Sequence, residues 1–208
     1  MPTIKAFRMD GLGNKFVIVD RRKDFVNISK EKIIHLGNLE SFHRDIGFDQ
    51  IIFIEKEVDK AFPITIFNSD GGEVSACGNG SRCIAYLLGK DLDTKEVKLK
   101  TNNRLLNAKI VGDLEVELAM GKPIFEWNKI PISKNLDHSN ITLNIEDKVF
   151  TDGFCLNVGN PHIIFFVKDC FKHDLKILGP KIENNKLKIL SNCCILHLCQ
   201  ENHLHKWQ

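Results

Sequence analysis

The segment Ala76–Cys83, with the sequence ACGNGSRC, contains the residue types that thiol chemistry needs. Cys77 stands in a glycine-rich loop, residues 75–80, that leads into a segment of helical character, residues 81–88. The free N–H groups and the positive dipole end of a helix favour an anion there. Two anions would benefit: a Cys77 thiolate, whose pKa would fall below the usual ~8.5, and a substrate carboxylate held on backbone N–H groups. The alternative is a cysteine buried at a helix start, and for Cys83, inside the apolar helix, core packing is favoured.

Amide side chains recur at the tips of the predicted loops. Asn and Gln offer both a donor and an acceptor without charge, so a set of them suits a zwitterionic substrate. Each one taken singly also fits ordinary turn chemistry. His162 follows the turn at residues 159–161, where it would orient a substrate or tune a thiol, although a lone histidine is more often structural. The amides in question are Asn14, Gln50, Asn68, Asn79 and Asn160.

The last stretch of the chain, residues 184–208, has a different composition. It contains three of the seven cysteines, three of the eight histidines and no Gly or Pro. Cys193 and Cys194 are adjacent, which is not the usual spacing of zinc ligands, so no metal site is predicted there. The glycine loops elsewhere match neither phosphate-binding pattern of nucleotide enzymes, so nucleotide binding is not predicted either.

The elements that must position these side chains are short strands and turns. A hairpin is predicted from strands 4–9 and 16–19, and a short helix over 33–39. Gly89 is the predicted stop of the helix at 81–88. Residues 175–183 predict a helical turn that Gly179-Pro180 interrupts. Gly121–Pro123 is the predicted domain boundary, and the whole pattern is α+β. Further strands are predicted over residues 50–54, 62–67, 97–101, 105–111, 114–120, 149–158 and 162–167.

Composition limits the class of protein. The chain has 208 residues, 43% of them hydrophobic, which suffices for one large or two small domains. Its 29 basic and 27 acidic residues nearly cancel, so charge does not indicate a nucleic-acid partner. The N-terminal residues do not form a signal peptide pattern, and the apolar runs are too short to cross a bilayer. We therefore expect a cytoplasmic protein whose cysteines are mostly reduced.

Five segments together resemble the diaminopimelate epimerase family, in that family's order and over residues 4 to about 183. The resemblance implies an α+β fold of two similar lobes, each a curled, mainly antiparallel sheet around a central helix. Here the first lobe would comprise residues 1–121, and an incomplete second lobe residues 122–208, with an atypical tail from about residue 184. The segments are Phe7–Asp20, Phe48–Gln50, Phe67–Gly71, Ala76–Cys83 and Val158–His162.

The resemblance also implies a function and a site. The reaction would be interconversion of LL- and meso-diaminopimelate in lysine biosynthesis, with no cofactor and no metal. Cys77 would be one of two catalytic thiols, with His162 in support. The predicted substrate-binding residues are Asn14, Gln50, Asn68, Gly78, Asn79 and Asn160. Asn192 lies near where the family has a further binding asparagine, but its neighbours do not fit.

The sequence departs from the family in one place. The family's second thiol lies in a late Ala-Cys-Gly-Thr-like loop, and none of Cys193, Cys194 and Cys199 is followed by the glycine of that loop. We therefore expect a truncated or frame-shifted member with impaired activity. The alternatives are a related amino-acid racemase of the proline racemase or hydroxyproline epimerase type, a non-catalytic binding module, and a redox or metal protein. We also expect diaminopimelate as the ligand, no membrane partner and a possible homodimer.

Overall fold

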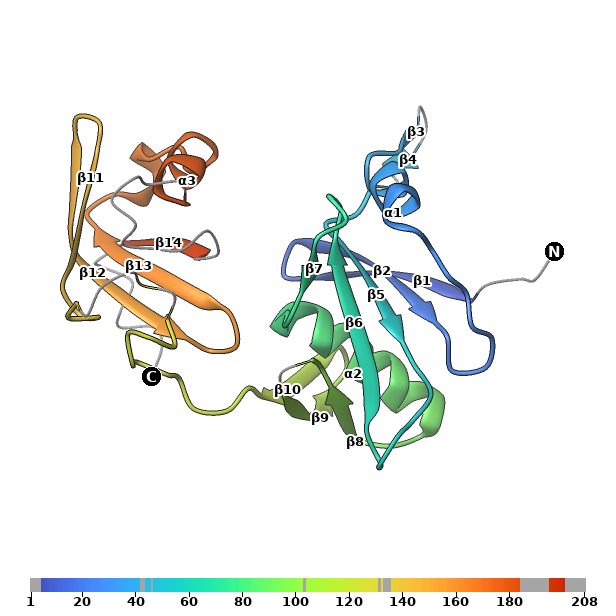
Figure 1. Cartoon of the computed structure of the whole chain (residues 1–208). Helices are drawn as coiled ribbons and strands as arrows, with labels where there is room; N and C mark the ends of the chain where they lie inside the picture. The colour runs from blue at the N-terminus through green and yellow to red at the C-terminus, as the bar shows by residue number, and fades with distance from the viewer. Residues whose placement is uncertain are drawn as a thin grey trace. The chain divides into compact units, whose positions relative to one another are not determined.

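The chain forms two compact units, Met1–Met120 and Gly121–Gln208, in a computed structural model (Figure 1). The structure describes residues 5–41, 44–45, 47–102, 104–130, 132, 136–183 and 195–200. Each unit has its own hydrophobic core. Within these described residues, no helix combines the length and the apolar character that crossing a membrane requires.

The first unit is built on one sheet in the order β1-β2-β5-β6-β8-β9-β10, with β7 beside β6. The pairs β2–β5 and β6–β8 are parallel, whereas the others in this sheet are antiparallel. The predicted hairpin is present, and Leu12 and Gly13 at its turn both have positive φ. The strands are β1 (Ala6–Gly11), β2 (Asn14–Asp20), β5 (Gln50–Ile54), β6 (Phe62–Asn68), β7 (Glu73–Val74), β8 (Glu96–Lys100), β9 (Leu105–Gly112) and β10 (Glu115–Ala119).

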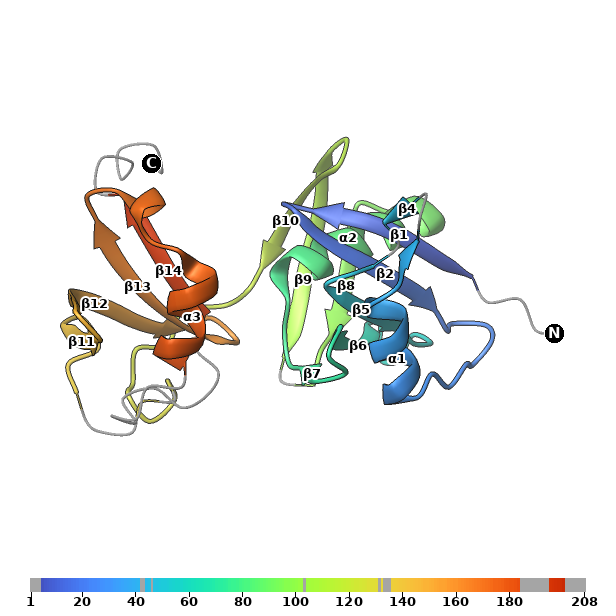
Figure 2. The same cartoon turned by 90° about the horizontal axis from the view of Figure 1, so that it is seen from above.

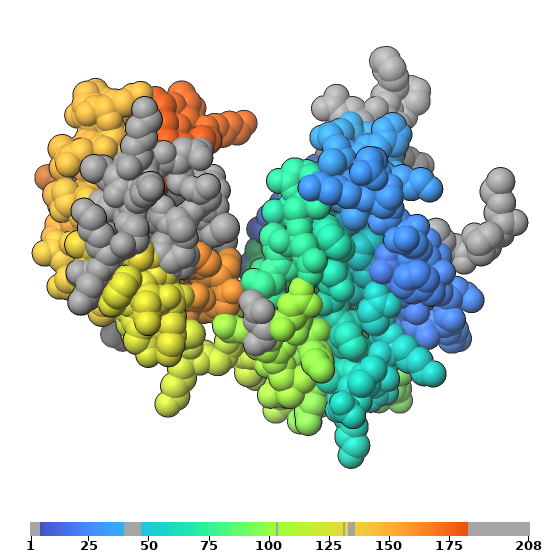
Figure 3. All heavy atoms as spheres, viewed as in Figure 1, coloured from blue at the N-terminus to red at the C-terminus, as the bar shows by residue number. Residues whose placement is uncertain are grey.

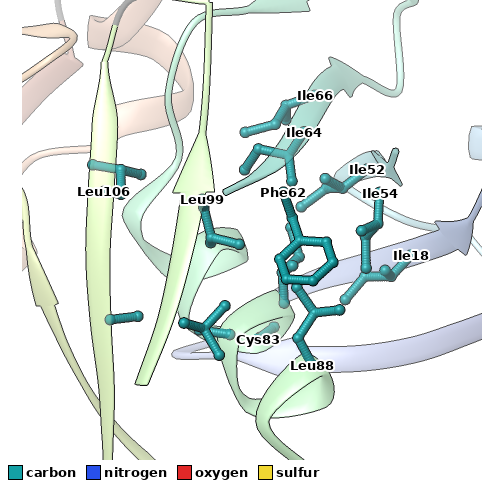
Figure 4. Packing of buried hydrophobic residues seen from close by; sticks show 14 of the residues in the cluster. Ile18, Ile52, Ile54, Phe62, Ile64, Ile66, Cys83, Leu88, Leu99 and Leu106 are labelled. Carbon is teal, nitrogen blue, oxygen red and sulfur yellow. The ribbon is translucent and has the colours of Figure 1, made fainter. Parts of the chain in front are cut away.

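The sheet curls around the helix α2 (Gly78–Leu92), which contacts β1, β2, β8, β9 and β10 (Figure 2). Buried side chains of the helix and the strands meet between them, among them Ile18, Ile52, Leu88 and Leu99 (Figure 4). Cys83 belongs to this cluster and is 7% exposed, which confirms its predicted place in the core. The curled sheet around a central helix therefore follows from apolar residues on one face of each strand meeting one face of α2.

The other face of the sheet is covered by the short helix α1 (Lys30–Gly37). Its Ile33 packs with Ile51 and Phe53 of β5 in a second cluster. Strand β5 is apolar on both faces because α1 covers one and α2 the other. Helix α1 also rests on the turn after β6, where Gly71 leaves room for Lys30, and the two segments touch in the space-filling view (Figure 3). A further short pair, β3 (Glu40–Ser41) and β4 (Arg44–Asp45), follows α1.

The second unit is a four-stranded sheet in the order β11-β12-β13-β14. Three strands are antiparallel neighbours, whereas β14 runs parallel to β13. On β11, Ile141, Leu143 and Ile145 alternate inward, and the core also takes Leu178 and Ile182 of α3. The elements are β11 (Ile141–Ile145), β12 (Lys148–Asn157), β13 (Pro161–Val167), the single turn η1 (Cys170–Lys172), α3 (Leu175–Glu183) and β14 (Ile195–Gln200).

Both ends of helix α2 differ from the sequence-based prediction, and α1 also begins and ends earlier than the predicted residues 33–39. Helix α2 begins at Gly78 rather than at residue 81, and it runs past Gly89 to Leu92. Asp93, in the left-handed conformation, ends it, and the N–H groups of Asp93 and Thr94 both donate to the Gly89 carbonyl. Gly89 is instead needed for close packing, because a Cβ there would lie 2.6 Å from Cδ1 of Ile110.

Helix α3 is a further correction. It continues through Pro180, although the sequence predicts an interruption there. Leu178 and Ile182, one turn apart, are 5% and 2% exposed and anchor the helix on both sides of the proline. Their burial outweighs the single hydrogen bond that the proline removes.

Candidate active site

Cys77 is the N-cap of α2, with extended backbone angles of φ −145° and ψ 108°. Its carbonyl accepts the first intrahelical hydrogen bond, from the Ser81 N–H at 2.9 Å. Its Sγ accepts the Gly80 N–H at 3.4 Å. This cap position is normally taken by Ser, Thr, Asp or Asn, whose oxygens are good acceptors. A neutral thiol is a weak acceptor, so the hydrogen bond strengthens when the sulfur ionises.

Burial is the largest influence on the pKa of this cysteine in the free protein. Desolvation raises the pKa of the Cys77 thiol, although the N–H groups of Gly80 and Asn79 and the charge of Arg82 act in the opposite direction. The predicted lowering of this pKa is therefore wrong for the free protein. The helix terminus does stabilise an anion at Cys77, but removing the sulfur from water opposes ionisation more strongly.

Both glycines of this segment are closely packed, Gly80 against strand β5 and Gly78 against Met120. A Cβ on Gly80 would lie 2.5 Å from Cδ1 of Ile52, and one on Gly78 would lie 3.1 Å from Sδ of Met120. Glycine is a poor helix former, by about 1 kcal/mol relative to Ala. The helix nevertheless starts at these residues, because only glycine lets its first turn approach the strands this closely.

Two predicted amides join the first turn of α2. The Nδ2 group of Asn79 donates to Oδ1 of Asn14 at 2.9 Å, and Oδ1 of Asn79 accepts a hydrogen bond from Arg82. Asn14 is the first residue of β2, at the end of the hairpin turn. The hydrogen bond between Asn79 and Asn14 thus ties the helix terminus to the edge of the sheet.

The other two predicted amides of the first unit form a second pair. Nε2 of Gln50 donates to Oδ1 of Asn68 at 2.9 Å. The Oε1 atom of Gln50 is buried and has no hydrogen-bond partner among the described residues. A buried acceptor of this kind is costly unless something donates to it, so it suits the ammonium group of a ligand.

Sheet topology places both amide pairs at the same end of neighbouring strands. Strands β2 and β5 are parallel and β6 is antiparallel to β5, so the starts of β2 and β5 lie beside the end of β6. Asp49 links the starts of β2 and β5. Its N–H donates to the Lys15 carbonyl at 2.9 Å, and its carboxylate accepts the Lys15 N–H at 2.8 Å. Segments distant in the sequence thus bring their polar ends together.

The remaining predicted residues lie elsewhere. Asn160 and His162 are in the second unit, at the start of β13, where Nε2 of His162 and Oδ1 of Asn160 are 3.1 Å apart. Asn192, Cys193 and Cys194 lie outside the described residues. In the described ranges, no three or more His, Cys, Asp or Glu residues gather as a metal site would require.

Sequence reasoning did not assign a role to Arg82. It lies five positions after Cys77, and its guanidinium reaches back along the helix toward Gly78 and Asn79. A sequence signal existed, since a basic residue close to a helix N-terminus is at the unfavourable end of the dipole. Asp49 was likewise seen only as part of a motif and not as the clamp between two strands.

Comparison with known proteins decides the family. The family model described as diaminopimelate epimerase matches residues 6–126. A protein of that name from Pelagibacter ubique (strain HTCC1062) is 48% identical over 187 residues, covering 88% of this chain and 67% of that protein. Another, from Wolbachia sp. subsp. Brugia malayi (strain TRS), is 34% identical over 209 residues, covering 97% and 75%. The chain belongs to the diaminopimelate epimerase family.

This family membership confirms the predicted family and the prediction of an isomerase. The chain spans about two thirds to three quarters of the length of these two relatives. A third relative of the same name, from Wolbachia sp. subsp. Drosophila simulans (strain wRi), is 36% identical, and 65% of its length is covered.

Solved structures support the fold. A predicted epimerase from Pseudomonas aeruginosa has a TM-score of 0.56 at 14% identity, covering 94% of this chain and 70% of that one. A hydroxyproline epimerase from Agrobacterium vitis with bound trans-4-OH-L-proline has a TM-score of 0.50 at 14% identity, covering 85% and 53%. At this identity the similarity concerns the fold alone, and it confirms the predicted α+β class.

Proposed function

We propose that this member of the diaminopimelate epimerase family acts on LL-diaminopimelate and meso-diaminopimelate, as an isomerase of lysine biosynthesis. Cys77 is the acid/base residue of the first unit. Asn14, Gln50, Asn68 and Asn79 bind the polar groups at one stereocentre, and the backbone N–H groups of Gly78 and Asn79 hold its carboxylate. In the second unit, Asn160 is a further substrate-binding residue and His162 supports the thiol chemistry. The protein acts in the cytoplasm, and a homodimer is its working assembly.

The observation that carries this proposal is the position of Cys77 at the N-terminus of α2, where Asn79 bonds Asn14 of β2, while the second amide pair lies at the same end of the neighbouring strands. An amino-acid centre carries a carboxylate and an ammonium group. The helix N-terminus suits the carboxylate, because its N–H groups and dipole both favour an anion. The buried Oε1 of Gln50 is an acceptor without a donor, and an ammonium group supplies that donor.

The reaction follows from these groups. Inverting the α-carbon breaks its C–H bond on one face, where a thiolate takes the proton as an S–H bond forms. On the other face an acid returns a proton, breaking its own bond to hydrogen as the new C–H bond forms. Negative charge develops on the α-carbon and its carboxylate between these steps. Fixed N–H groups aimed at that carboxylate stabilise the charge without having to reorganise.

Burial suits Cys77 to the acid half of this exchange. The raised pKa of its thiol keeps the proton on sulfur in the free protein, ready to be donated. In the reverse direction Cys77 must be the thiolate, and the Gly80 N–H at its Sγ is then the donor that supports the charge. The same hydrogen bond therefore helps the base role while burial helps the acid role.

The proposal is tested by proton exchange. The chain is incubated with LL-diaminopimelate in deuterium oxide, and the α-proton signal is followed by NMR. We expect exchange in the wild type, a loss of at least about 10²-fold in Cys77→Ala, and no change in the matched variant Cys170→Ala, which lies in the second unit. No exchange in the wild type, or undiminished exchange in Cys77→Ala, contradicts the proposal.

The stereochemistry of the product tests the sequence-based expectation of impaired activity. Exchange with retained configuration corresponds to one working acid/base group. Formation of the meso isomer at a comparable rate means that a second group works in the same protein. A panel including proline and hydroxyproline separates the related racemases, since activity on those amino acids alone would replace diaminopimelate as the substrate.

A further inference from the structure

The side chain of Arg82 controls the orientation of two amides at the proposed site. A guanidinium has only donors, so the atom of Asn79 that it contacts must be the carbonyl oxygen. The NH₂ group of Asn79 then points the other way and donates to Oδ1 of Asn14 at 2.9 Å. Each step of this chain leaves the next amide only one favourable orientation.

The consequence appears at Asn14. An amide can turn over with little change of shape, so its donor and acceptor are set by its neighbours. With its oxygen engaged by Asn79, Asn14 has its NH₂ group left, and in the described part of the chain that group has no further partner. The series of hydrogen bonds from Arg82 to Asn79 to Asn14 therefore ends in the N–H donors of Asn14 at the start of β2, next to the first turn of α2.

The placement of Arg82 on α2 supports a functional reason for its presence. A cation near a helix N-terminus is electrostatically unfavourable, and the first turn of α2 contains no acidic residue to offset it. None of the ion pairs found among the described residues includes Arg82. Burial raises the pKa of the Cys77 and Cys83 thiols, and the charge of Arg82 offsets part of that rise. An anion at this end of the helix would gain from all three features.

We propose that Arg82 is a positioning residue that fixes the Asn79 amide and, through it, the Asn14 amide, so that the remaining NH₂ group of Asn14 is directed at the substrate carboxylate. This inference rests on the proposed function, because it specifies how the same site recognises an anion. Arg82 touches the amide of Asn79, and it acts on the substrate through that amide.

The first experiment needs no activity. The protein is labelled selectively at asparagine nitrogen, and the side-chain NH₂ resonances of Asn14 and Asn79 are compared by NMR. We expect both pairs to shift in Arg82→Met and to stay close to wild type in Arg82→Lys, which keeps a donor. Lys90→Met, on the last turn of the same helix, is the matched loss of charge and should leave both pairs in place. Unmoved resonances in Arg82→Met overturn the proposal.

The second experiment uses the exchange reaction. In Arg82→Met we expect KM for LL-diaminopimelate to rise about tenfold, the usual effect of losing one hydrogen bond to a charged group, with a smaller change in kcat. In a protein that already carries Asn79→Ala, adding Arg82→Met should raise KM by less than about twofold, because the amide through which Arg82 acts is absent. Full additivity of the two substitutions would mean that Arg82 acts independently of Asn79, and the proposal fails.

The two experiments also separate this inference from the proposed function. If the wild type shows no exchange, the proposed function fails, while the amide resonances still decide whether Arg82 orients Asn79 and Asn14. Backbone spectra of each variant are recorded alongside. A general collapse of those spectra in Arg82→Met would assign Arg82 to folding, and Arg82→Lys would then be the variant on which the KM comparison is judged.

Discussion

Gly80 offers a quantitative test of how tightly the first turn of α2 sits on the sheet. An alanine methyl there would lie 2.5 Å from Cδ1 of Ile52 and 3.3 Å from Cε1 of Phe16. Carbon atoms normally pack at about 3.5–4.0 Å, so the overlap with Ile52 is about 1 Å. Both neighbours are fully buried, at 0% exposure, and have no solvent to move into. Overpacking costs about 1–3 kcal/mol, whereas alanine gains about 1 kcal/mol over glycine in a helix. We expect Gly80→Ala to lower the free energy of unfolding by up to about 2 kcal/mol.

A second substitution isolates the steric contribution. Ile52→Val removes the clashing Cδ1 atom and by itself costs about 0.5–1.5 kcal/mol. In the double variant the alanine methyl occupies the space that Cδ1 leaves. We therefore expect the double variant to be more stable than the sum of the single effects by at least about 1 kcal/mol. Additive effects would refute the close contact between Gly80 and Ile52.

The assay must report on the first unit alone. Both tryptophans, Trp127 and Trp207, lie beyond residue 120, so their fluorescence reports on the second unit. Urea unfolding is therefore followed by pulsed hydrogen exchange and mass spectrometry, with peptides from α2 as the probe. Cooperative units of one protein unfold with different free energies, which this readout keeps apart.

Three further predictions concern the same unit. Ser81 is fully buried and its hydroxyl has no partner among the described residues, so Ser81→Ala should raise the free energy of unfolding by about 1–2 kcal/mol; a loss of stability contradicts this. Because burial raises the pKa of Cys77, its alkylation by iodoacetamide should have a midpoint at higher pH than that of a free cysteine peptide, and an equal or lower midpoint would refute the assignment. The hydrogen bond from Arg22 lowers the pKa of Asp20, so this carboxylate stabilises the fold above its unfolded pKa of about 3.9 and ceases to do so as the pH falls through its lower folded value. Asp20→Asn should therefore cost about 1–3 kcal/mol near neutral pH and progressively less in acid, as urea midpoints across pH will show.

The strands could be predicted because their apolar residues alternate or run in short blocks between turns. The hairpin turn at Gly11–Asn14 and the apolar block at Gln50–Ile54 are examples. The structure has strands on both sides of the turn and one strand over the block. Alternation and turn residues are local signals that tertiary packing rarely reverses. The pairing order is not local, so the parallel contacts of β2 with β5 and β6 with β8 had no sequence signal.

The helix boundaries were harder to predict because a glycine can mark either a loop or a close contact between elements. At Gly78 and Gly80 the glycines indicated a loop, yet both lie in the helix, where a Cβ on Gly80 would clash with Ile52 and one on Gly78 would lie in tight contact with Met120. At Gly89 a glycine read as a stop, yet it packs against Ile110. Close approach in three dimensions, rather than backbone conformation, explains all three residues, and no local pattern contains that information.

The candidate site illustrates the same difference between residue type and environment. The sequence identified the amides by type, and the structure pairs Asn79 with Asn14 and Gln50 with Asn68. The sequence could not indicate which atom of each amide faces its partner. That depends on Arg82 for the first pair, and a guanidinium contact across one turn of a helix cannot be inferred from composition.

The pKa of Cys77 links the fold to the chemistry of the site. A sulfur at the N-cap stabilises α2 weakly as a thiol and more strongly as a thiolate, so ionisation of Cys77 and the stability of the first helical turn are coupled. Burial acts against ionisation, whereas the Gly80 and Asn79 N–H groups and the Arg82 charge act in its favour. The acid/base role proposed for Cys77, in which it both donates and accepts a proton, requires such opposing contributions, because a strongly acidic thiol would be a poor donor and a strongly basic one would rarely be ionised. The burial of the sulfur, the N–H groups of Gly80 and Asn79 and the charge of Arg82 therefore act on one property, the proton affinity of Cys77.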